Sequence, residues 1–218
     1  LFRFDEKDMS VVVMCGMSSV FSAVFGTPLT AAVFTLEVIS VGQIYYASLL
    51  PCLGSSLAAY GISLSLGAVP ERFYGVKVAD FNLPSVLRVA LLGVLCALLS
   101  MVFCIVMKRS SKLIKSFIKN VYVRILAGSA AVILLTLICG SQKYNGTGMS
   151  LVESAVLHGN AQPWDFALKL LFTAISLGVG FRGGEIVPAF AVGATFGCVF
   201  GGLLGLDPGF AAAVGLIA

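Results

Sequence analysis

Long apolar runs, separated by short breaks rich in glycine, proline and threonine, make up most of this chain. Four of these runs predict apolar helical segments, of which that at 84–107 is the longest. They cover residues 9–25, 45–67, 84–107 and 122–140. Further helices are predicted where an apolar run follows a break. They cover residues 28–40, 149–158, 165–179 and 186–203, with one more beginning after GLDPG at 205–209.

The helix predicted over 28–40 follows the break GTP at 26–28. Thr27 can cap this helix, and Pro28 suits its first position, where a missing N–H costs nothing. A helix of this length is too short to cross a hydrocarbon core of about 30 Å. Such half-length helices are typical of transporters that build ion sites from broken helices.

The composition places the chain in a membrane. Of its 218 residues, 59% are hydrophobic and 11% are charged, whereas soluble domains carry about 25% charged residues. We therefore expect an all-α, polytopic integral membrane protein. The six cysteines stand singly inside apolar runs and His158 is the one histidine, so we expect no metal site, cofactor or disulfide framework. The basic residues lack the interleaved aromatic residues of a nucleic-acid surface, so no nucleic-acid partner is expected.

Basic residues gather in one segment, KRSSKLIKSFIKNVYVR at 108–124, which contains no acid. It holds six of the fourteen lysines and arginines: Lys108, Arg109, Lys112, Lys115, Lys119 and Arg124. Basic residues are enriched in the short cytoplasmic loops of membrane proteins. The segment therefore predicts a cytoplasmic loop between two membrane helices, and the more polar stretch at 68–83 predicts another loop outside the membrane.

The stretch GFRGGEIVPAF at 180–190 places glycines and charges immediately before an apolar helix. Gly183 and Gly184 permit backbone conformations that other residues adopt only at a cost, and Pro188 is tolerated in the first turn of a helix. The N–H groups of residues 185–187 then lack partners within the helix and lie at the positive end of its dipole. Irregular backbone survives in a membrane only where it lines a cavity or is buried in protein. These features predict an anion-binding site at the helix start.

Glu185 adds a carboxylate to this predicted site. Its attraction to the helix dipole is worth about 0.3–1 kcal/mol, less than the cost of about 2.5–3.5 kcal/mol for an acid in mid-membrane. A charged carboxylate competes with an anion for the same N–H groups, and a protonated one vacates them. We therefore expect Glu185 to couple an anion to a proton. Arg182 is a candidate partner for Glu185, an attractor of anions or an interfacial anchor.

Two motifs, in this order and at this separation, resemble one family of membrane proteins. GMSSVFSAVFGTPLTAAVFTLEV at 16–38 resembles the region of helices G and H in the CLC chloride channel and transporter family. GGEIVPAFAVGATFG at 183–197 resembles the family's G-x-F-x-P motif at the start of helix N and the G-A-x-x-G run that follows. The predicted helix at 84–107 then corresponds to helix J, and the basic segment to the cytoplasmic J–K loop.

The resemblance extends over the whole chain, from helix G to the beginning of helix O. It implies that residues 1–218 are an interior or C-terminal portion of a single CLC transmembrane domain, truncated at both ends. The family's fold is built from broken and re-entrant helices of unequal length. The gating glutamate of the family's G-R-E-G segment and its late pore residue are expected to lie outside this portion.

Two departures from the usual pattern indicate a subgroup. Glu185 and Ile186 stand where chloride-type members have an apolar residue followed by phenylalanine. The pattern G-F-[RK]-G-G-E-x-x-P resembles the fluoride-selective CLC-F clade of bacterial fluoride/proton antiporters. Val38 follows Glu37 where chloride/proton exchangers carry an internal proton-transfer glutamate. The resemblance implies fluoride/proton antiport that protects cells from fluoride, with the glutamate at 185 taking part in ion coupling.

The resemblance also implies a setting and a set of site residues. We expect a homodimer in a bacterial inner membrane, in contact with lipid, that binds fluoride or chloride and protons, with helices over about 28–65 in the dimer contact. Glu37 is expected to form a structural salt bridge or to line the internal ion route, and Arg182 to lie on a proton or ion pathway. The expected anion-binding and coupling residues share one helix start: Gly184, Glu185, Ile186, Val187 and Pro188.

The nearest alternative is a voltage-gated-type chloride channel or a chloride/proton exchanger of the same family. An intramembrane enzyme would need a nucleophile–base pair or an inward-facing metal cluster, and the isolated acids and single His158 offer neither. A purely structural membrane protein would not need two breaks that each open a helix with free N–H groups. We therefore expect transport rather than catalysis or scaffolding.

Overall fold

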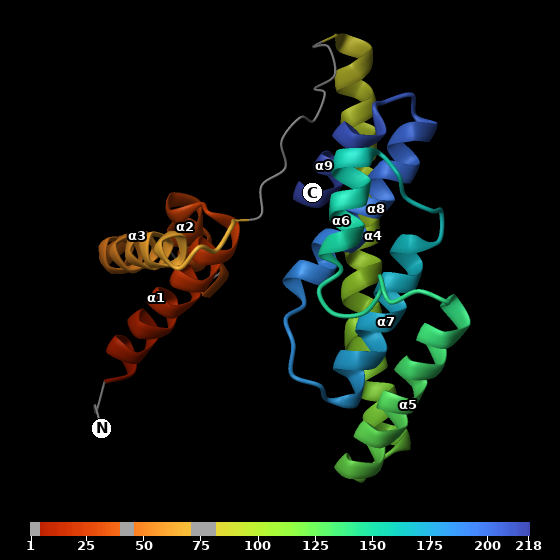
Figure 1. The fold of residues 1–218 in the computed structure, drawn as a ribbon, viewed down its shortest axis with the longest axis horizontal. Helices are drawn as coiled ribbons and strands as arrows, with labels where there is room; N and C mark the ends of the chain where they lie inside the picture. Colours follow the sequence, from red (N-terminus) through yellow and green to blue (C-terminus); the bar gives the residue numbers. More distant parts are fainter. Residues whose placement is uncertain (1–4, 40–45, 71–81) are drawn as a thin grey trace. The chain divides into compact units, whose positions relative to one another are not determined.

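The computed structural model describes residues 5–39, 46–70 and 82–218, and in these ranges the chain is helical and contains no strand. The chain divides into two compact units, Leu1–Arg72 and Phe73–Ala218. Helices α1 to α3 form the first unit, coloured red to orange in Figure 1, and α4 to α9 form the second, coloured yellow to blue.

The first unit contains three α-helices and a short 3-10 helix that precedes the last of them. They are α1 (Glu6–Phe25), α2 (Pro28–Ile39), η1 (Tyr46–Ser48) and α3 (Leu49–Ser65). Gly26 ends α1 in the left-handed conformation, with φ of 67°, and α2 begins at Pro28, so the break predicted at GTP is confirmed. The twelve residues of α2 rise only about 18 Å, which is shorter than a membrane core.

Serine hydroxyls join α1 to α3. Ser18 Oγ donates to the carbonyl of Cys52 at 2.8 Å, and one turn later Ser22 Oγ donates to the carbonyl of Ser56 at 2.8 Å. Both donors are fully buried. Ser55 Oγ on α3 donates back to a carbonyl of α1 at 3.2 Å. These bonds form a serine ladder, and small hydroxyl-bearing residues of this kind let helix backbones approach closely in lipid.

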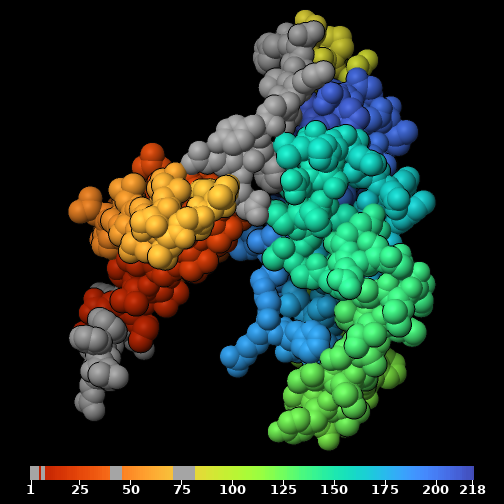
Figure 2. Space-filling model, in the orientation of Figure 1, coloured from red at the N-terminus to blue at the C-terminus, as the bar shows by residue number. Residues whose placement is uncertain are grey.

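Helix α4 (Leu83–Phe117) is the longest element and extends along the second unit (Figure 1). Helices α7, α8 and α9 contact α4, α5 packs on α7, and α6 packs on α8 and α9. In Figure 2 the green and cyan helices α5 and α6 form much of the visible face of this unit. The remaining helices are α5 (Val121–Cys139), α6 (Met149–His158), α7 (Asp165–Val179), α8 (Ile186–Leu203) and α9 (Pro208–Ile217).

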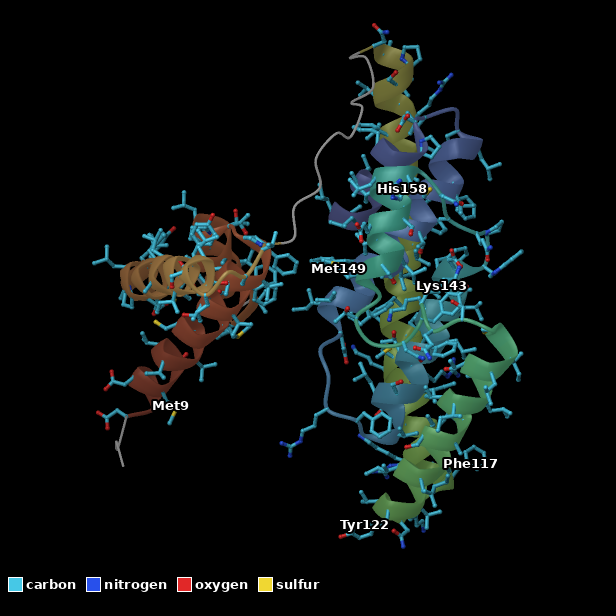
Figure 3. All side chains as sticks on the ribbon, viewed as in Figure 1. Met9, Phe117, Tyr122, Lys143, Met149 and His158 are labelled. Atoms are coloured by element: carbon cyan, nitrogen blue, oxygen red, sulfur yellow. The ribbon has the colours of Figure 1, made fainter. Side chains whose placement is uncertain are left out.

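The prediction of a loop over 108–124 is wrong. Helix α4 continues to Phe117 and α5 begins at Val121, so residues 118–120 alone connect them. Figure 3 shows Phe117 and Tyr122 at the same end of the unit. Lysine, arginine and leucine are good helix formers, so the loss of hydropathy after residue 107 marks where the apolar stretch ends and not where the helix ends. The 35 residues of α4 rise about 52 Å, well beyond a core of about 30 Å.

Five helical segments of the described ranges are long and apolar enough to cross a membrane. They are Asp8–Phe25, Tyr46–Ser65, Leu83–Phe117, Val121–Cys139 and Ile186–Leu203. Helices α2 and α9 are apolar but shorter. The second unit therefore combines long and half-length helices, as the spacing of the breaks predicts.

Glycines bring α8 and α9 into backbone contact. Gly193, Gly197 and Gly201 recur every fourth residue along one side of α8 and face α9 around Ala211 and Gly215. A Cβ atom on Gly197 would overlap the carbonyl oxygen of Ala211 and would lie 3.0 Å from the Cα of Gly215. This glycine face of α8 is the small-xxx-small pattern that allows close helix packing in membranes.

Candidate functional site

The loop of residues 180–185 connects the end of α7 to the start of α8 (Figure 1). Gly180 closes α7 in the left-handed conformation, with φ of 107°, and its N–H donates to carbonyls in the last turn of α7. Glu185 is the N-cap residue of α8, which begins at Ile186 and has Pro188 in its first turn. The predicted break and the predicted helix start are therefore confirmed.

The backbone of this loop requires a glycine at position 180, and not at positions 183 and 184 as predicted. Gly180 has a positive φ, whereas Gly183 and Gly184 are not in the left-handed region. A Cβ atom on Gly184 would meet nothing within 4 Å, and one on Gly183 would lie 3.3 Å from Leu177 Cδ2. The left-handed turn is required where the chain leaves α7, because that turn satisfies the last carbonyls of the helix.

Two backbone donors at the start of α8 have no acceptor within the helix. The N–H groups of Ile186 and Val187 precede the first i to i−4 bond, which the Ala189 N–H makes to the Glu185 carbonyl at 3.0 Å. Pro188 has no N–H. The two free donors lie at the positive end of the helix dipole, which is the arrangement that binds anions.

A cavity of about 500 Å³ lies at this helix start. Its walls come from α5, the loop before α6, α7, and the 180–185 loop together with the first turn of α8. Arg182, Gly184, Val187 and Pro188 are among its lining residues. The irregular backbone between α7 and α8 thus lines a cavity, which is where a membrane protein tolerates it.

Glu185 and Ile186 are not among the residues that line the cavity. The Glu185 side chain is exposed and makes no capping hydrogen bond to α8. Arg182 is also exposed. The one ion pair in the described ranges joins Lys143 to Asp165, so Arg182 is not paired with Glu185 there.

Glu37 lies in the first unit, near the C-terminal end of α2. Its side chain is exposed, and it forms no ion pair with another described residue. Both roles expected for Glu37, a structural salt bridge and a place on the ion route, stay predictions.

Helix α7 carries two buried charged residues that were not predicted from the sequence. Asp165 is 3% exposed and Lys169 is 1% exposed, and they lie one turn apart. Lys169 lines the cavity, whereas Asp165 is not among its lining residues. The sequence did contain a signal for Lys169, which lies in the apolar run LKLLFTAISLGV. An ionisable residue within such a run is costly in a membrane and is a functional candidate by default.

Asp165 accepts three hydrogen bonds at the start of α7. Its Oδ1 accepts from Lys143 Nζ at 2.9 Å and from the Tyr144 hydroxyl at 2.6 Å, and its Oδ2 accepts from the Gln162 N–H at 2.9 Å. Figure 3 places Lys143 beside α7. Burial, together with the hydrogen bond to Asp165, raises the pKa of Tyr144 above its ordinary value, so the hydroxyl keeps its proton. The carboxylate holds the loop before α6 against α7.

Lys169 holds the same loop one turn further along α7. Its Nζ donates to the carbonyl of Tyr144 at 3.0 Å and to the carbonyl of Gly146 at 2.7 Å. Gly148, with φ of 81°, leaves the space that the lysine occupies, since a Cβ there would lie 2.6 Å from Lys169 Cε. The loop wall of the cavity is thus positioned by two charged residues of α7.

Arg124 on α5 positions the other end of α7. Its Nε donates to the carbonyl of Val179 at 3.0 Å, which satisfies a carbonyl in the last turn of that helix. Gly128, also on α5, packs directly against the Val179 side chain. Because the 180–185 loop starts here, α5 determines where that loop leaves the helix.

Known proteins resemble the chain along its whole length. Residues 1–218 match the family model described as voltage gated chloride channel. The chain is 34% identical over 225 aligned residues to a chloride/fluoride channel protein of Pseudomonas syringae pv. tomato, covering 100% of this chain and 49% of that protein. It is 22% identical over 202 residues to an uncharacterised protein of Methanocaldococcus jannaschii, covering 91% of this chain and 51% of the relative.

A solved structure has the same fold. The crystal structure of a CLC-type fluoride/proton antiporter matches with a TM-score of 0.90 and 30% identity, over 97% of this chain and 53% of the antiporter chain. The chain thus spans about half the length of the relatives it matches. The expected all-α, polytopic membrane fold with helices of unequal length is confirmed. With a family match over every residue, this chain belongs to the voltage-gated chloride channel (CLC) family.

Proposed function

We propose that this chain is part of a CLC-type fluoride/proton antiporter and that the start of α8 binds the transported anion. The observation that carries the proposal is a helix start with two backbone donors that have no acceptor within the helix, Ile186 and Val187, of which Val187 lines a cavity of about 500 Å³. The likeness to a fluoride/proton antiporter, at 30% identity, supports fluoride as the anion. In this role Gly184 and Pro188 shape the helix start, and Arg182 lies on the anion pathway.

Glu185 is the group that couples the anion to the proton in this proposal. As the N-cap residue of α8 it stands next to the free donors, yet its side chain is exposed and uses none of them. A charged carboxylate at this position competes with the anion for the N–H groups and repels it, and a protonated carboxyl does neither. The protonation state of Glu185 therefore links anion binding to proton binding, and coupling requires such a link.

Fluoride fits this chemistry better than larger halides do. It is small and strongly hydrated, so a site must offer strong, closely spaced donors to replace its water. Backbone N–H groups at a helix start and a protonated carboxyl are donors of that kind. Hydrogen fluoride is itself a weak acid, so a protonatable carboxylate is a suitable partner for the ion.

The proposed setting is a homodimer in the inner membrane of a bacterium, in contact with lipid, in which both units of this chain belong to one transmembrane domain. The chloride/fluoride channel protein of Pseudomonas syringae pv. tomato supports a bacterial membrane. Transport requires no bond-making step by the protein, so no enzymatic role is part of the proposal. Glu37, at the end of α2, is assigned to the ion route.

Flux from liposomes tests the choice of anion. The full-length protein is reconstituted, and the efflux of fluoride and of chloride is followed with ion-selective electrodes. We expect fluoride efflux to exceed chloride efflux by tenfold or more and to carry protons in the opposite direction. Equal efflux rates for the two anions would contradict the assignment of fluoride as the transported anion.

Replacing Glu185 tests the coupling. Glu185→Gln keeps the size of the side chain and removes its titration, so we expect fluoride-driven proton movement to fall at least tenfold. Glu153→Gln on α6 is the matched control, because that glutamate is exposed and is not among the cavity-lining residues, and it should retain coupling. Unchanged proton movement in Glu185→Gln would show that Glu185 does not take part in coupling and is only the N-cap residue of α8.

A chloride channel or chloride/proton exchanger is the second candidate. The Pseudomonas syringae pv. tomato relative is named a chloride/fluoride channel protein, and the inclusion of chloride in that name supports this second candidate. It predicts chloride flux that equals or exceeds fluoride flux in the same liposomes. The same experiment therefore separates the two functions.

A further inference from the structure

Lys169 is a buried cation that has no carboxylate partner among the described residues. Its side chain is 1% exposed, and the ion pair found in those ranges joins two other residues, Lys143 and Asp165. Its Nζ has two acceptors, the carbonyls of Tyr144 and Gly146. These acceptors are neutral dipoles, so the positive charge of the ammonium is solvated but not neutralised.

The acid one turn away does not supply the missing negative charge. Asp165 already accepts from Lys143, from Tyr144 and from the Gln162 N–H. Its charge is balanced by Lys143, which pairs with it at 2.9 Å. The group of Lys143, Asp165 and Lys169 therefore carries a net charge of +1 inside the protein.

A cation buried in a membrane protein without an opposite charge is expensive, and such residues pair with one another or face a cavity. Lys169 faces the cavity of about 500 Å³ that also meets the start of α8. An ammonium has three donors, and two of them are used by the loop carbonyls. The third donor and the uncompensated charge are available to a group in the cavity.

We propose that the Lys169 ammonium forms an anion subsite on the α7 wall of this cavity, in addition to the donors at the start of α8. The ligand is a small monovalent anion of the halide class, such as fluoride or chloride. The inference rests on the proposed anion transport and adds a second point of attraction within the same cavity. A cation on one wall and a helix start on another give the anion two successive partners as it passes through the cavity.

The competing role for Lys169 is purely structural, because it also holds the loop before α6. Asp165 offers a matched control, since it holds the same loop through Lys143 and Tyr144 but does not line the cavity. Asp165→Asn loosens the loop and leaves the Lys169 ammonium in place, and by removing a negative charge it raises the net charge of the group from +1 to +2. A structural role predicts similar effects of the two residues on anion binding, and an anion subsite predicts different ones.

The test is a fluoride titration of the purified full-length protein in detergent by calorimetry, with sodium fluoride as the probe. We expect Lys169→Met to raise the Kd for fluoride at least tenfold, which is about 1.4 kcal/mol. Lys169→Arg, which keeps the charge, should have a fluoride Kd within about threefold of that of the unmodified protein. Asp165→Asn keeps the ammonium and removes a negative charge, so its fluoride Kd should be unchanged or lower. Equal losses in Lys169→Met and Asp165→Asn, or no loss in Lys169→Met, would overturn the subsite.

A second pair of variants keeps Lys169 in place in case its replacement prevents folding. Thr173 follows Lys169 by one turn on α7 and also lines the cavity. Thr173→Asp gives the ammonium a tethered carboxylate, so we expect it to occupy the subsite and raise the fluoride Kd at least tenfold. Thr173→Asn introduces a side chain of the same shape as aspartate but without its charge, so this variant should bind fluoride as the unmodified protein does. Equal affinities for Thr173→Asp and Thr173→Asn would contradict the proposal.

Failure of this proposal is distinguishable from failure of the proposed function. If the unmodified protein binds neither fluoride nor chloride, anion transport itself is wrong. If it binds the anion, and neither Lys169→Met nor Thr173→Asp weakens that binding, anion transport stands and Lys169 is a structural residue.

Discussion

The two units of this chain join their helices in different ways. In the first unit α1 and α3 are linked by the serine ladder, in which buried hydroxyls such as those of Ser18 and Ser22 donate to carbonyls of the facing helix. In the second unit the glycine face of α8 places its backbone against α9, and buried charges on α7 hold a loop. Helix contact in the first unit depends on hydrogen bonds between helices, whereas the second unit depends on close backbone packing and on buried charged side chains.

This difference matters because lipid removes the usual driving force for helix association. An apolar side chain is as well accommodated by lipid as by another helix, so packing and hydrogen bonds must supply the specificity. A hydrogen bond between membrane helices is worth about 0.6 kcal/mol on average, whereas overpacking a close contact costs about 1–3 kcal/mol or more. We therefore expect the second unit to be the less tolerant of substitution.

The largest effect is expected from adding one methyl group to the glycine face. Gly197→Ala would place a Cβ against the Ala211 carbonyl oxygen, where no flexible side chain can move aside. We expect a loss of about 3 kcal/mol or more, or failure to fold. The midpoint of thermal unfolding of the full-length protein in detergent measures it.

The matched control is Gly54→Ala on α3 of the first unit, where a Cβ would meet nothing within 4 Å. Alanine is favoured over glycine in a helix by about 0.5–1 kcal/mol, so this change should be neutral or slightly stabilising. A destabilised Gly54→Ala protein would show that glycine packing is shared by both units and would remove the contrast between them.

An intermediate effect is expected from removing the buried acid of α7. Asp165→Ala leaves the Tyr144 hydroxyl and the Lys143 ammonium without their acceptor. Breaking a buried pair by removing one partner costs about 3–5 kcal/mol, and we expect a value near the lower limit because Lys143 is 30% exposed and can be hydrated. Thermal unfolding is again the measurement. Lys143→Ala should cost about 1 kcal/mol or less, and a larger loss for Lys143→Ala than for Asp165→Ala would contradict this account.

The smallest effect is expected in the serine ladder. Ser22→Ala removes one donor to the Ser56 carbonyl and leaves the backbones in contact, so we expect a loss of about 0.6 kcal/mol. Ser65→Ala is the control, because that exposed hydroxyl bonds within its own helix. A loss in Ser22→Ala as large as that in Gly197→Ala would mean that hydrogen bonds, and not backbone contact, dominate in both units.

Several elements were predictable because their signals are local. Gly26 and Pro28 separate α1 from α2, and the bounds predicted for α6, α7 and α8 agree with the structure. The start of α8 with Pro188 in its first turn was also predictable. Each of these depends on a break or on the length of an apolar run, both of which can be read from neighbouring residues.

Other features were missed or misplaced because they depend on distant residues. The end of α4 was misplaced, since hydropathy reports the apolar stretch and the helix continues beyond it. Gly183 and Gly184 were expected to carry the unusual backbone, and Gly180 carries it instead. Lys169 was not singled out, because its partners, the carbonyls of Tyr144 and Gly146, come from a separate loop.

From its amino acids alone, this chain is recognisable as a membrane protein of unequal helices with a helix start suited to an anion. Those conclusions follow from composition, from glycine and proline positions and from two motifs, all of which act over a few residues. The folded chain was needed to show that the helix start lies at a cavity, that Glu185 does not line it and that Lys169 does. A cavity and the charge inside it arise from segments that meet in space, and no local pattern along the chain encodes which side chains face the same space.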